Sequence, residues 1–470
     1  MVCSLRPHRG SGVIPIAEPE FINPSASNPP SPRPSPPLTR GERAGSGGIL
    51  HAQQFVNFGR AIGIRGEGKE SMRAPLTAHS SNLHLSGTPP SHTAGEGLGV
   101  RAKQHAPHAI ASNAPHAPNR RQADPRMRAD YTPHRVQSPA VKYAVAIVGA
   151  TGAVGQELLQ VLEARRFPVR SLRLLASERS AGTELRFCGE RVRVESLQPD
   201  SFRGIDIAFF SAGSARSKEF APLAVQAGAV VIDNSSAFRM QPEVPLVIPE
   251  INPDAIATHK GIIANPNCST IILLMALEPL RRLSRIRRVV VSTYQAASGA
   301  GARAMQELLD ATRAYLSGEP YTPTVLPHPY AFNLFSHDSA IGEDGYNEEE
   351  RKVILETRKI WGDPAIAVSP TCVRVPVLRA HSESIVAELE TRPPLEAIYE
   401  AYRAFEGVQL VDDRARNHFP MPIEATGRDE VLVGRIRYDV GTPNGVALFA
   451  CGDQLRKGAA LNAVQIAERL

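Results

Sequence analysis

The sequence predicts an α/β protein whose ordered part begins with a doubly wound, Rossmann-like domain. Two observations lead to this fold class. A glycine-rich turn at 149–155 joins an apolar strand-like run to a helical pattern, and strands alternate with helices after it. This alternation is typical of a parallel sheet covered by helices. A third observation, a proline-rich composition that stops near residue 138, sets the start of the ordered part. The 470 residues are enough for two or three domains.

Residues 1–138 differ in composition from the rest of the chain. They hold 18 of the 40 prolines and 9 of the 14 histidines, with 16 of the 53 basic but only 8 of the 47 acidic residues. Such a segment buries too little apolar surface to offset the entropy of ordering. We expect it to be disordered, or to precede a natural start nearer Met127; a targeting peptide is a third interpretation. The basic excess lies here, so charge does not indicate a nucleic-acid partner for the folded part.

Cysteine content and hydropathy narrow the class of protein further. The five cysteines are widely spaced and form no C-x-x-C pair, so neither a metal site nor a disulfide framework is expected. Unpaired cysteines favour a reducing, cytoplasmic setting. No apolar run reaches ~18 residues, the length needed to span a membrane, so no membrane partner is expected.

The glycine-rich turn at 149–155 is the first candidate site. The apolar run 143–148 is typical of a buried strand, and 156–162 has a helical pattern. In this context the glycines permit a tight bend, and the helix N-terminus faces the pyrophosphate of a dinucleotide. The spacing is G-x-x-G-x-x-G, a variant of the usual form. The predicted cofactor contacts in the turn are Gly149, Thr151, Gly152, Ala153, Val154 and Gly155.

The end of the next expected strand, 171–176, bears on the choice of cofactor. It is followed by Ser177, Glu178, Arg179 and Ser180. A lone acid would suit the free ribose 2′-hydroxyl of NAD. An arginine between hydroxyl side chains better suits the 2′-phosphate of NADP, through charge-assisted hydrogen bonds. We therefore predict NADP, with Ser177, Arg179 and Ser180 as ligands, although Glu178 argues for NAD.

The remaining strands of this half are expected at 205–210 and 229–233, with a helix near 218–227 between them. The loop 211–214 then follows the carboxyl end of a strand. Doubly wound sheets bind ligands at this edge. The loop is therefore expected to lie close to the glycine-rich turn.

Residues 265–270, Asn-Pro-Asn-Cys-Ser-Thr, lead into the apolar run 271–277. Ser269 and Thr270 suit the first turn of a helix better than its interior, which places Cys268 at or near a helix N-terminus. Free backbone N–H groups and the positive end of the helix dipole favour a thiolate there. Cys268 is therefore either a nucleophile for a carbonyl carbon or a small buried thiol.

Two later segments supply candidate partners for this thiol. A strand at 288–294 runs into the small-residue turn 295–301, where backbone can approach a ligand closely. A second strand at 371–377 places its valines on one face and Arg374 on the other, where a guanidinium can bind a carboxylate. His381, in the polar stretch that follows, is either a proton acceptor near neutral pH or a structural histidine.

Together these residues resemble the aspartate-β-semialdehyde dehydrogenase family. The resemblance covers about 141–470 and rests on GATGAVG at 149–155, SERSAG at 177–182, DNSSAFR at 233–239, NPNCST at 265–270, QAASGAG at 295–301, TCVRVPVLRAHSES at 371–384 and GAALNAVQIAE at 458–468. It implies a Rossmann-like domain at 139–267, completed by a C-terminal helix at about 450–470, and an α+β domain at 268–449 for catalysis and dimerisation. The family has nothing corresponding to 1–138.

The resemblance also implies an activity. The family carries out the NADPH-dependent reductive dephosphorylation of L-aspartyl-4-phosphate to L-aspartate 4-semialdehyde, by way of a cysteine thioester. This step belongs to the biosynthesis of lysine (through diaminopimelate), threonine and methionine. The expected partners are this substrate and product, phosphate and a second copy of the chain, with a tetramer left open.

Site roles transfer by motif. Cys268 resembles the acyl-accepting thiol and His381 the acid/base. Arg374 resembles the residue that holds the substrate α-carboxylate. Glu349 and Lys352 match an E-x-x-K pair for the substrate amino group and phosphate. For this pair a slip of alignment to Glu350 or an exposed charged helix face are the rival interpretations. The other implied substrate ligands are Arg239, Asn267 and Gln295, and the other implied cofactor contacts are Ser298, Gly299 and Asn462.

Several alternatives remain at this point. N-acetyl-γ-glutamyl-phosphate reductase runs the same chemistry on a longer, acylated substrate, but the Asn-Cys-Ser sequence and an E-x-x-K pair suited to a free amine argue against it. An acyl-CoA reductase relative is less expected. A non-catalytic, nucleotide-binding family member should lack the thiol or the histidine, and this chain has both Cys268 and His381.

Overall fold

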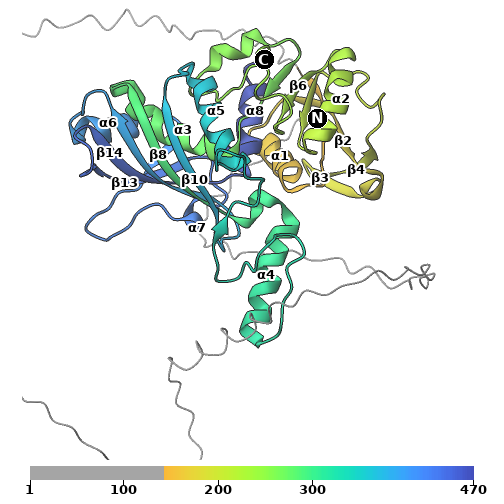
Figure 1. Ribbon diagram of the computed structural model, residues 1–470. Helices are drawn as coiled ribbons and strands as arrows, with labels where there is room; N and C mark the ends of the chain where they lie inside the picture. Colours follow the sequence, from red (N-terminus) through yellow and green to blue (C-terminus); the bar gives the residue numbers. More distant parts are fainter. Residues whose placement is uncertain (1–141) are drawn as a thin grey trace, which may run out of the picture. The chain divides into compact units, whose positions relative to one another are not determined.

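The structure of the protein is a computed structural model that describes residues 142–470, and the expectations for residues 1–138 lie outside this range. Two sheets of seven strands each form the framework of the described residues (Figure 1). The first is built from 143–264 and the second from 286–452. The predicted α/β class, with a Rossmann-like first half, is confirmed.

The first sheet has the order β3-β4-β2-β1-β5-β6-β7 and is parallel except for the β3–β4 hairpin at one edge. Its strands are β1 (Tyr143–Val148), β2 (Val169–Ala176), β3 (Glu184–Phe187), β4 (Glu190–Ser196), β5 (Ile207–Phe210), β6 (Val230–Asp233) and β7 (Ile262–Ala264). Because β2 pairs with one side of β1 and β5 with the other, the chain reverses direction across the sheet at β1. Sheets of this kind bind ligands at such a switch point.

Helices cover both faces of this sheet. The helices are α1 (Ala153–Ala164), α2 (Ser214–Gln226) and the short η1 (Glu178–Ser180) and η2 (Pro253–Thr258). Alternate residues of β1 enter different clusters. Ile147 packs with α1 and the C-terminal helix, whereas Val148 packs with α2. This alternation follows from the two-residue period of a strand and explains why β1 is apolar throughout.

The C-terminal helix packs beside α1, although it lies some 300 residues later in the sequence. It comprises a π-helical turn, η4 (Arg456–Ala460), and α8 (Leu461–Ala467). Val464 of α8 and Leu158 of α1 are both fully buried in one cluster. The helix begins at Arg456, later than the predicted position near 450, because the apolar run 445–452 forms a strand of the second sheet.

The second sheet is mixed, with the order β12-β13-β14-β11-β8-β10-β9. Its strands are β8 (Ile286–Gln295), β9 (Phe335–Ser336), β10 (Ala367–Arg374), β11 (His381–Leu389), β12 (Val408–Leu410), β13 (Val431–Tyr438) and β14 (Gly445–Gly452). β10 ends at Arg374 rather than at Val377 as predicted. Pro376 lacks the N–H that the ladder would need to continue. His381 is the first residue of β11, in the middle of the sheet.

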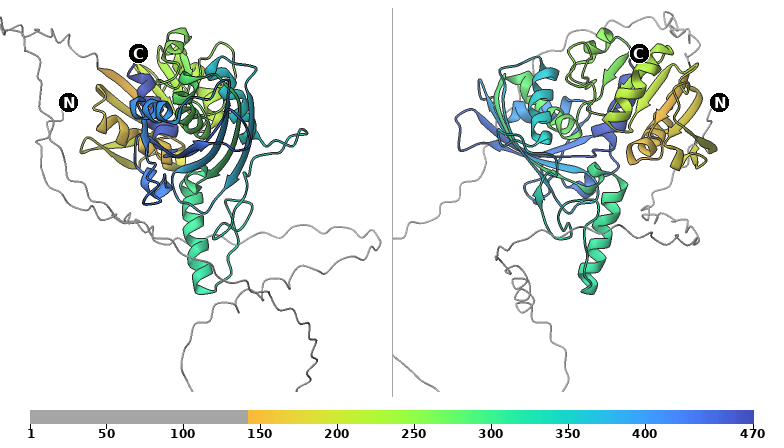
Figure 2. Two further views of the ribbon diagram at one scale, coloured as in Figure 1. Left: turned by 90° about the vertical axis from the view of Figure 1, so that its left-hand side faces the viewer. Right: turned by 45° about the vertical axis from the view of Figure 1, so that its right-hand side comes forward.

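The other helices belong to this half of the chain. They are α3 (Cys268–Leu283), η3 (Ala297–Ala300), α4 (Ala302–Ser317), α5 (Glu348–Trp361), α6 (Leu395–Ala404) and α7 (Pro422–Ala425). α4 projects away from the sheets, as both views in Figure 2 show. Its last turn carries the exposed side chains Tyr315 and Leu316.

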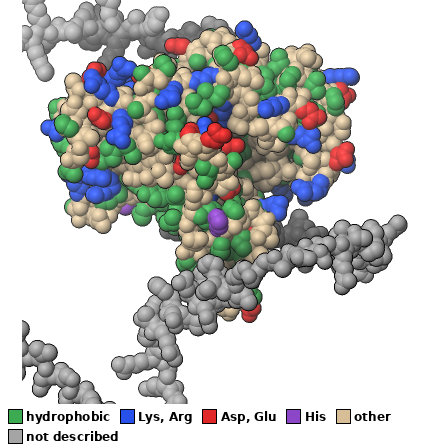
Figure 3. Space-filling view, viewed as in Figure 1, with side chains coloured by type: hydrophobic (Ala, Val, Ile, Leu, Met, Phe, Trp, Pro, Cys, Tyr) green, Lys and Arg blue, Asp and Glu red, His purple; other side chains and the backbone are tan. Residues whose placement is uncertain are grey.

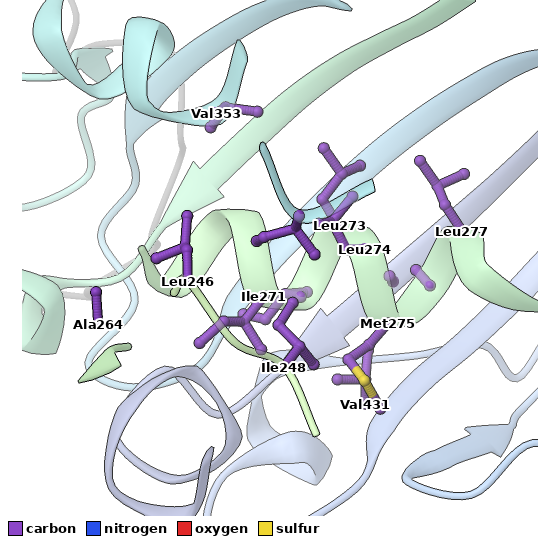
Figure 4. Packing of buried hydrophobic residues seen from close by; sticks show 14 of the residues in the cluster. Leu246, Ile248, Ala264, Ile271, Leu273, Leu274, Met275, Leu277, Val353 and Val431 are labelled. Atoms are coloured by element: carbon purple, nitrogen blue, oxygen red, sulfur yellow. The ribbon is translucent and has the colours of Figure 1, made fainter. Parts of the chain in front are cut away.

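Helix α3 forms the centre of the largest core. Every residue from Ile271 to Leu277 is buried, which fits a helix that is apolar all round. Figure 4 shows Ile271 and Met275 among side chains from distant segments, including Leu246, Val353 and Val431. Truncating a side chain of this run, such as Leu274, is expected to cost about 2–5 kcal/mol. This packing fixes α3, and with it the cysteine at its first turn.

The surface in view in Figure 3 mixes basic and acidic side chains, with acidic groups gathered over the start of α5. The exposed acids of that segment are Glu343, Asp344 and Glu348. Within 142–470, no helix is long and apolar enough to cross a bilayer, and no cluster of His, Cys, Asp and Glu is arranged to hold a metal ion.

Candidate active site

Two hollows contain most of the residues singled out in the sequence. The first, which we call the glycine-turn hollow, has a volume of about 690 Å³. It opens at the carboxyl ends of β1, β2 and β5, the switch point of the first sheet. Its lining is Val148, Gly149, Thr151, Gly152, Ala176, Ser177, Glu178, Arg179, Ser180, Ser196, Leu197, Gln198, Ser211, Ala212, Arg216 and Phe220.

The glycine turn has the steric features that a dinucleotide site needs. Gly149 has φ +88°, and a Cβ there would lie 2.8 Å from the carbonyl oxygen of Ser211. At Gly155 a Cβ would lie 2.3 Å from the carbonyl oxygen of Gly149. Only glycine therefore allows the turn to close against α1. Gly152 is the N-cap of α1. Because glycine has no side chain, the first N–H groups of this helix have no side-chain cap. These residues fit a bound pyrophosphate.

The ribose end of this hollow contains the predicted Ser177, Arg179 and Ser180. Glu178, the residue that argued for NAD, lines it as well. Arg216 of α2 also lines this hollow. It lies 37 residues after Arg179 in the sequence, and only the fold brings the two arginines to one hollow, so Arg216 was not singled out from the sequence. Arg216 is paired with Glu219 at 2.8 Å on the surface of α2. Two guanidinium groups therefore line this hollow, and either can supply a counter-charge to a phosphate.

The second hollow, the thiol hollow, has a volume of about 320 Å³. Residues from both halves of the chain line it: Val154, Asn234, Ser236, Arg239, Asn265, Pro266, Asn267, Cys268, Gln295, Ser298, Gly299, His337, Glu349, Lys352, Arg374, His381, Gln454, Leu455, Gly458 and Ala459. All eight predicted catalytic and substrate-binding residues are in this list. Val154, Ser298 and Gly299, predicted as cofactor contacts, lie here and not in the glycine-turn hollow.

Cys268 is the first residue of α3, as predicted, and its side chain is partly exposed to the hollow. Asn267 is the N-cap. Its Oδ1 accepts from the N–H groups of Ser269 at 3.0 Å and Thr270 at 3.2 Å. Its Nδ2 donates to Glu349 Oε1 at 2.8 Å. Asn267 therefore joins the start of the cysteine helix to a buried carboxylate on α5.

The surroundings of Cys268 in the ligand-free hollow oppose the thiolate that was expected at this helix start. Burial, and then the Glu349 carboxylate, raise the pKa of Cys268 to about 12 against the opposing effects of Arg239 and Arg374. Two of the N–H groups that were expected to stabilise the thiolate are already capped by Asn267. The resting form of Cys268 is therefore the thiol.

His381 is fully buried at the start of β11, with its imidazole at the thiol hollow. Nδ1 accepts the N–H of Ala296 at 3.0 Å, whereas Nε2 has no partner. Burial, and then Arg374, lower the pKa of His381 to about 3, so the ring is neutral near pH 7. With Nδ1 acting as acceptor, the ring proton lies on Nε2. Gly299 leaves room for it, because a Cβ there would lie 3.2 Å from Nε2.

Arg374 ends β10 and is held from one side. Its Nε pairs with Asp338 Oδ1 at 2.9 Å, and a Cβ at Gly299 would lie 3.2 Å from its Nη1. The terminal nitrogens can therefore bind a carboxylate in the hollow. His337, beside Asp338, also lines the hollow, and burial and Arg374 lower its pKa to about 4. Neither His337 nor Asp338 could be singled out from the sequence, because an irregular loop supplies both.

Glu349 and Glu350, the rival members of the E-x-x-K pair, differ in their burial and contacts. Glu349 is 4% exposed and lines the thiol hollow, so it does not belong to an exposed helix face. Glu350 lies outside the hollow. Its carboxylate completes the capping box with Asn347 and accepts the N–H of Cys372 at 3.0 Å. Lys352 Nζ is 3.0 Å from Glu349 Oε2, and Gln295 Nε2 donates to Glu349 Oε1 at 3.1 Å.

Arg239 is also buried at the hollow and is not a solvated end. Its Nε donates to the carbonyl of Asn265 at 2.9 Å and its Nη1 to Glu356 Oε1 at 3.0 Å. Glu356 was not singled out in the sequence. The available signal was its spacing, since Glu349, Lys352 and Glu356 follow one another at i, i+3 and i+7 on α5 and so share one face of the helix.

Three predicted cofactor contacts lie outside both linings. Asn462 is fully buried and all of its polar atoms have protein partners. Nδ2 donates to Asn265 Oδ1 and the Val247 carbonyl, and Oδ1 accepts from Lys457. Asn462 joins the C-terminal helix to the chain before α3, and its contact with a cofactor stays a prediction. Gly155 packs inside the glycine turn, and Ala153 is the first residue of α1.

The fold and the two hollows define a class of protein. A glycine turn that fits a dinucleotide lies at the switch point of a Rossmann-like sheet. A thiol, a neutral imidazole and three basic side chains line the second hollow. This combination is that of a dinucleotide-dependent oxidoreductase that acts on a carbonyl through a cysteine.

Comparison with known proteins narrows this class. The chain matches the family models for the NAD binding domain of semialdehyde dehydrogenase over 144–259 and for its dimerisation domain over 277–457. The aspartate-semialdehyde dehydrogenase of Synechocystis sp. is 56% identical over 326 residues, which is 69% of this chain and 96% of the relative. That of Aquifex aeolicus is 53% identical, over 70% of this chain and 98% of the relative.

A solved structure gives the same result. Aspartate semialdehyde dehydrogenase II from Vibrio cholerae, complexed with ASA, is 45% identical with a TM-score of 0.69, over 70% of this chain and 98% of that one. The chain belongs to the aspartate-semialdehyde dehydrogenase family. The predicted family is thereby confirmed, as is the combination of an NAD(P)-binding domain with a second, dimerisation domain.

Proposed function

We propose that the protein converts L-aspartyl-4-phosphate to L-aspartate 4-semialdehyde with NADPH, and that Cys268 carries the acyl group as a thioester. The observation that carries this proposal is the composition of the thiol hollow. It holds the thiol beside a neutral imidazole, a buried carboxylate and three cationic side chains, Arg239, Lys352 and Arg374. These charges complement a substrate with one ammonium, one carboxylate and one phosphate.

Each charged group of the substrate has a counterpart of opposite charge in the thiol hollow. Arg374 binds the α-carboxylate with its terminal nitrogens, since Nε is taken by Asp338. Glu349 binds the α-ammonium, displacing Lys352, which turns to the phosphate with Arg239. A buried anion such as Glu349 requires a cation, whereas an N-acetylated substrate would present a neutral amide. This argues against the N-acetyl-γ-glutamyl-phosphate reductase alternative.

The first step forms the thioester. The sulfur of Cys268 bonds to the acyl carbon while the bond from that carbon to the phosphate oxygen breaks. The thiol proton leaves on the departing phosphate, so no other base is needed for this step. Arg239 and Lys352 neutralise the leaving group. The thiol form that the hollow favours is therefore a workable starting state.

The second step reduces the thioester, and NADPH, when bound in the glycine-turn hollow, would supply the hydride. The Nε2–H of His381 donates a hydrogen bond to the oxygen on which charge develops. As the carbon–sulfur bond breaks and the aldehyde forms, the sulfur of Cys268 takes a proton from solvent. The cofactor preference for NADP is supported by Arg179 and Arg216 in the glycine-turn hollow.

The active assembly that we propose is a homodimer formed by the second sheet. Residues Val290, Ser292 and Tyr294 alternate along β8 with buried neighbours that face α3, so they point to the other face, where they are partly exposed. The rings of Tyr294 and Phe449 are tilted against each other there, with their centroids 6.3 Å apart. A charge placed at Val290 should dissociate the dimer, as measured by analytical ultracentrifugation. The tetramer stays open.

Two further assignments belong to this proposal. Residues 139–267 and the C-terminal helix hold the dinucleotide, while 268–449 supply the thiol and the dimer face. We propose the cytoplasm as the working compartment, since no disulfide joins the cysteines of residues 142–470.

The test is a spectrophotometric assay. The purified protein is incubated with L-aspartate 4-semialdehyde, phosphate and NADP, then with NAD, while reduced cofactor is followed. We expect phosphate-dependent reduction that is faster with NADP. Cys268→Ser should bind NADPH normally, by fluorescence titration, and lose about a thousandfold or more in turnover, because serine is a far weaker nucleophile. Full activity of this variant would disprove the thioester route.

A further inference from the structure

The side chain of Glu356 has no part in the proposed chemistry, yet it connects two parts of the thiol hollow. It is 1% exposed, on the third turn of α5. Oε1 accepts from Arg239 Nη1 at 3.0 Å, and Oε2 accepts the backbone N–H of Asn267 at 2.6 Å. One carboxylate therefore holds both a cation of the hollow and the residue that precedes Cys268.

Both partners depend on this carboxylate for their placement. The guanidinium of Arg239 is fixed at two other points, by the carbonyls of Asn265 and Asn234. Glu356 is the carboxylate partner of Arg239 within the described residues. Each terminal nitrogen still has one N–H that can reach into the hollow. Arg239 is thus aimed by contacts behind it.

On the other side of Glu356, the backbone N–H and both side-chain polar atoms of Asn267 have hydrogen-bond partners. Its N–H goes to Glu356, its Oδ1 caps α3 and its Nδ2 goes to Glu349. The peptide unit that leads into Cys268 is therefore tied to α5 by two separate carboxylates. Burial raises the pKa of Glu356, and Arg239 and the Asn267 N–H oppose this effect. Because donors face both oxygens, the geometry suits the ionised form.

We propose that Glu356 is a positioning residue that sets the placement of Arg239 relative to the sulfur of Cys268. The proposal rests on the proposed function, in which Arg239 binds the phosphate that leaves as the sulfur attacks. Both groups must be correctly placed around the same acyl carbon, and a misplacement of about 1 Å can cost 100-fold in rate. A single bridging carboxylate keeps them in register.

Glutamine at this position is the sharpest test because it has nearly the same shape. A carboxylate presents two acceptors, whereas an amide presents one acceptor and one donor. Whichever way the amide turns in Glu356→Gln, its NH₂ meets either Arg239 or the N–H of Asn267. Glu356→Asp keeps the charge but is one methylene shorter, so it is expected to keep only one of the two contacts.

The experiment measures steady-state kinetics of semialdehyde oxidation with NADP and phosphate. In Glu356→Gln we expect the KM for phosphate to rise roughly 10- to 100-fold, the range for a lost hydrogen bond to a charged group. The rate at which an alkylating agent labels Cys268 should also change. The KM for semialdehyde should change far less, because Arg374 and Glu349 are untouched.

Glu307→Gln is the matched control. Glu307 is also a buried glutamate, and its carboxylate accepts the N–H groups of Thr324, Val325 and Leu326, but it lies outside the thiol hollow. This variant should lose thermal stability and keep its KM for phosphate. A merely structural role for Glu356 predicts the same pattern in both variants.

A double-mutant cycle with Arg239→Lys covers the case in which Glu356→Gln folds poorly. In that case the cycle combines Glu356→Asp with Arg239→Lys. The effects of the two substitutions on the phosphate KM should be non-additive, because both alter the contact between Glu356 and Arg239. An unchanged phosphate KM in a folded variant, or an additive cycle, would overturn the positioning role. Absence of phosphate-dependent activity in the unsubstituted protein would instead refute the proposed function, so the two failures are distinguishable.

Discussion

The helices α1 and α3 begin in opposite ways, although each follows a strand of the first sheet and opens on a hollow. α1 starts at Gly152, which offers no side-chain cap to its N–H groups. α3 starts at Asn267, whose side chain caps two of them and also binds Glu349. One helix end is open to an external anion, and the other is closed by the protein itself.

This difference separates two kinds of site. At α1 the protein supplies donors and leaves their partner to arrive, which suits a cofactor that must bind and leave. At α3 the donors are already used, so the first turn is held rigidly and the sulfur is presented in a fixed place. The helix dipole is the same in both cases. What differs is whether a side chain of the protein caps the N–H groups at the positive end of that dipole.

The largest effect is expected from giving α1 the closed form. In Gly152→Asp the new carboxylate would cap the first N–H groups and repel the pyrophosphate, so NADPH affinity should fall about 100-fold. Fluorescence titration measures it. Gly152→Ala is the control for space, since a Cβ there lies 3.2 Å from the Gly149 carbonyl. Equal losses in both variants would mean that steric contact, and not charge, explains the result.

The reverse change opens α3. Asn267→Ala removes the cap and the contact to Glu349, so the start of the helix should loosen around Cys268. We expect kcat to fall roughly 10- to 100-fold and stability to fall by about 1 kcal/mol. Stopped-flow assays and thermal unfolding measure the two effects. NADPH affinity should be unchanged, and its loss would show that the two helix ends are not independent.

A smaller effect is expected at the ribose end of the glycine-turn hollow. Arg216→Ala should raise the KM for NADP about tenfold and leave that for NAD unchanged, because only NADP carries the 2′-phosphate. The same assay applied to Arg179→Ala shows which guanidinium contributes more. A parallel rise in both KM values would contradict the assignment of this end to the phosphate.

The smallest effect concerns the acidity of the thiol. The negative charge of Glu349 raises the pKa of Cys268, so replacing it with glutamine should lower that pKa and increase the thiolate fraction at any pH below it. The curve of alkylation rate against pH should move down by about 0.5–1 pH unit. Glu350→Gln, one residue along α5 and outside the hollow, should leave the curve in place. A shift to higher pH for Glu349→Gln would reverse the argument.

The sequence predicted those features whose signals are local. The strand, turn and helix around 143–162 and the helix start at Cys268 depend on neighbouring residues, and all of them were found. Contacts set by the fold were not predictable in the same way. Arg216 lines the glycine-turn hollow from α2, and Glu356 lies behind the thiol hollow, where it contacts the lining residues Arg239 and Asn267. The rise in the pKa of Cys268 could not be predicted either, because it comes first from burial and then from the Glu349 carboxylate on α5.

The hydrogen-bond partners of Asn462 could not be predicted from its motif alone. The segment 458–468 matched the family, but its asparagine turned out to bridge Asn265 and Lys457 inside the core. Nothing in the motif itself distinguishes an amide that faces a ligand from one that faces another amide. Burial decides, and burial depends on packing between segments nearly 200 residues apart.

Gly458, in the π-helical turn η4, lies directly against the cysteine helix. A Cβ at this position would lie 3.0 Å from the Cβ of Cys268, so the tail of the polypeptide forms one wall around the reactive sulfur. During synthesis on the ribosome, the nucleophile is complete long before this wall exists. Without Gly458 and the residues around it, the thiol would be unshielded on this side.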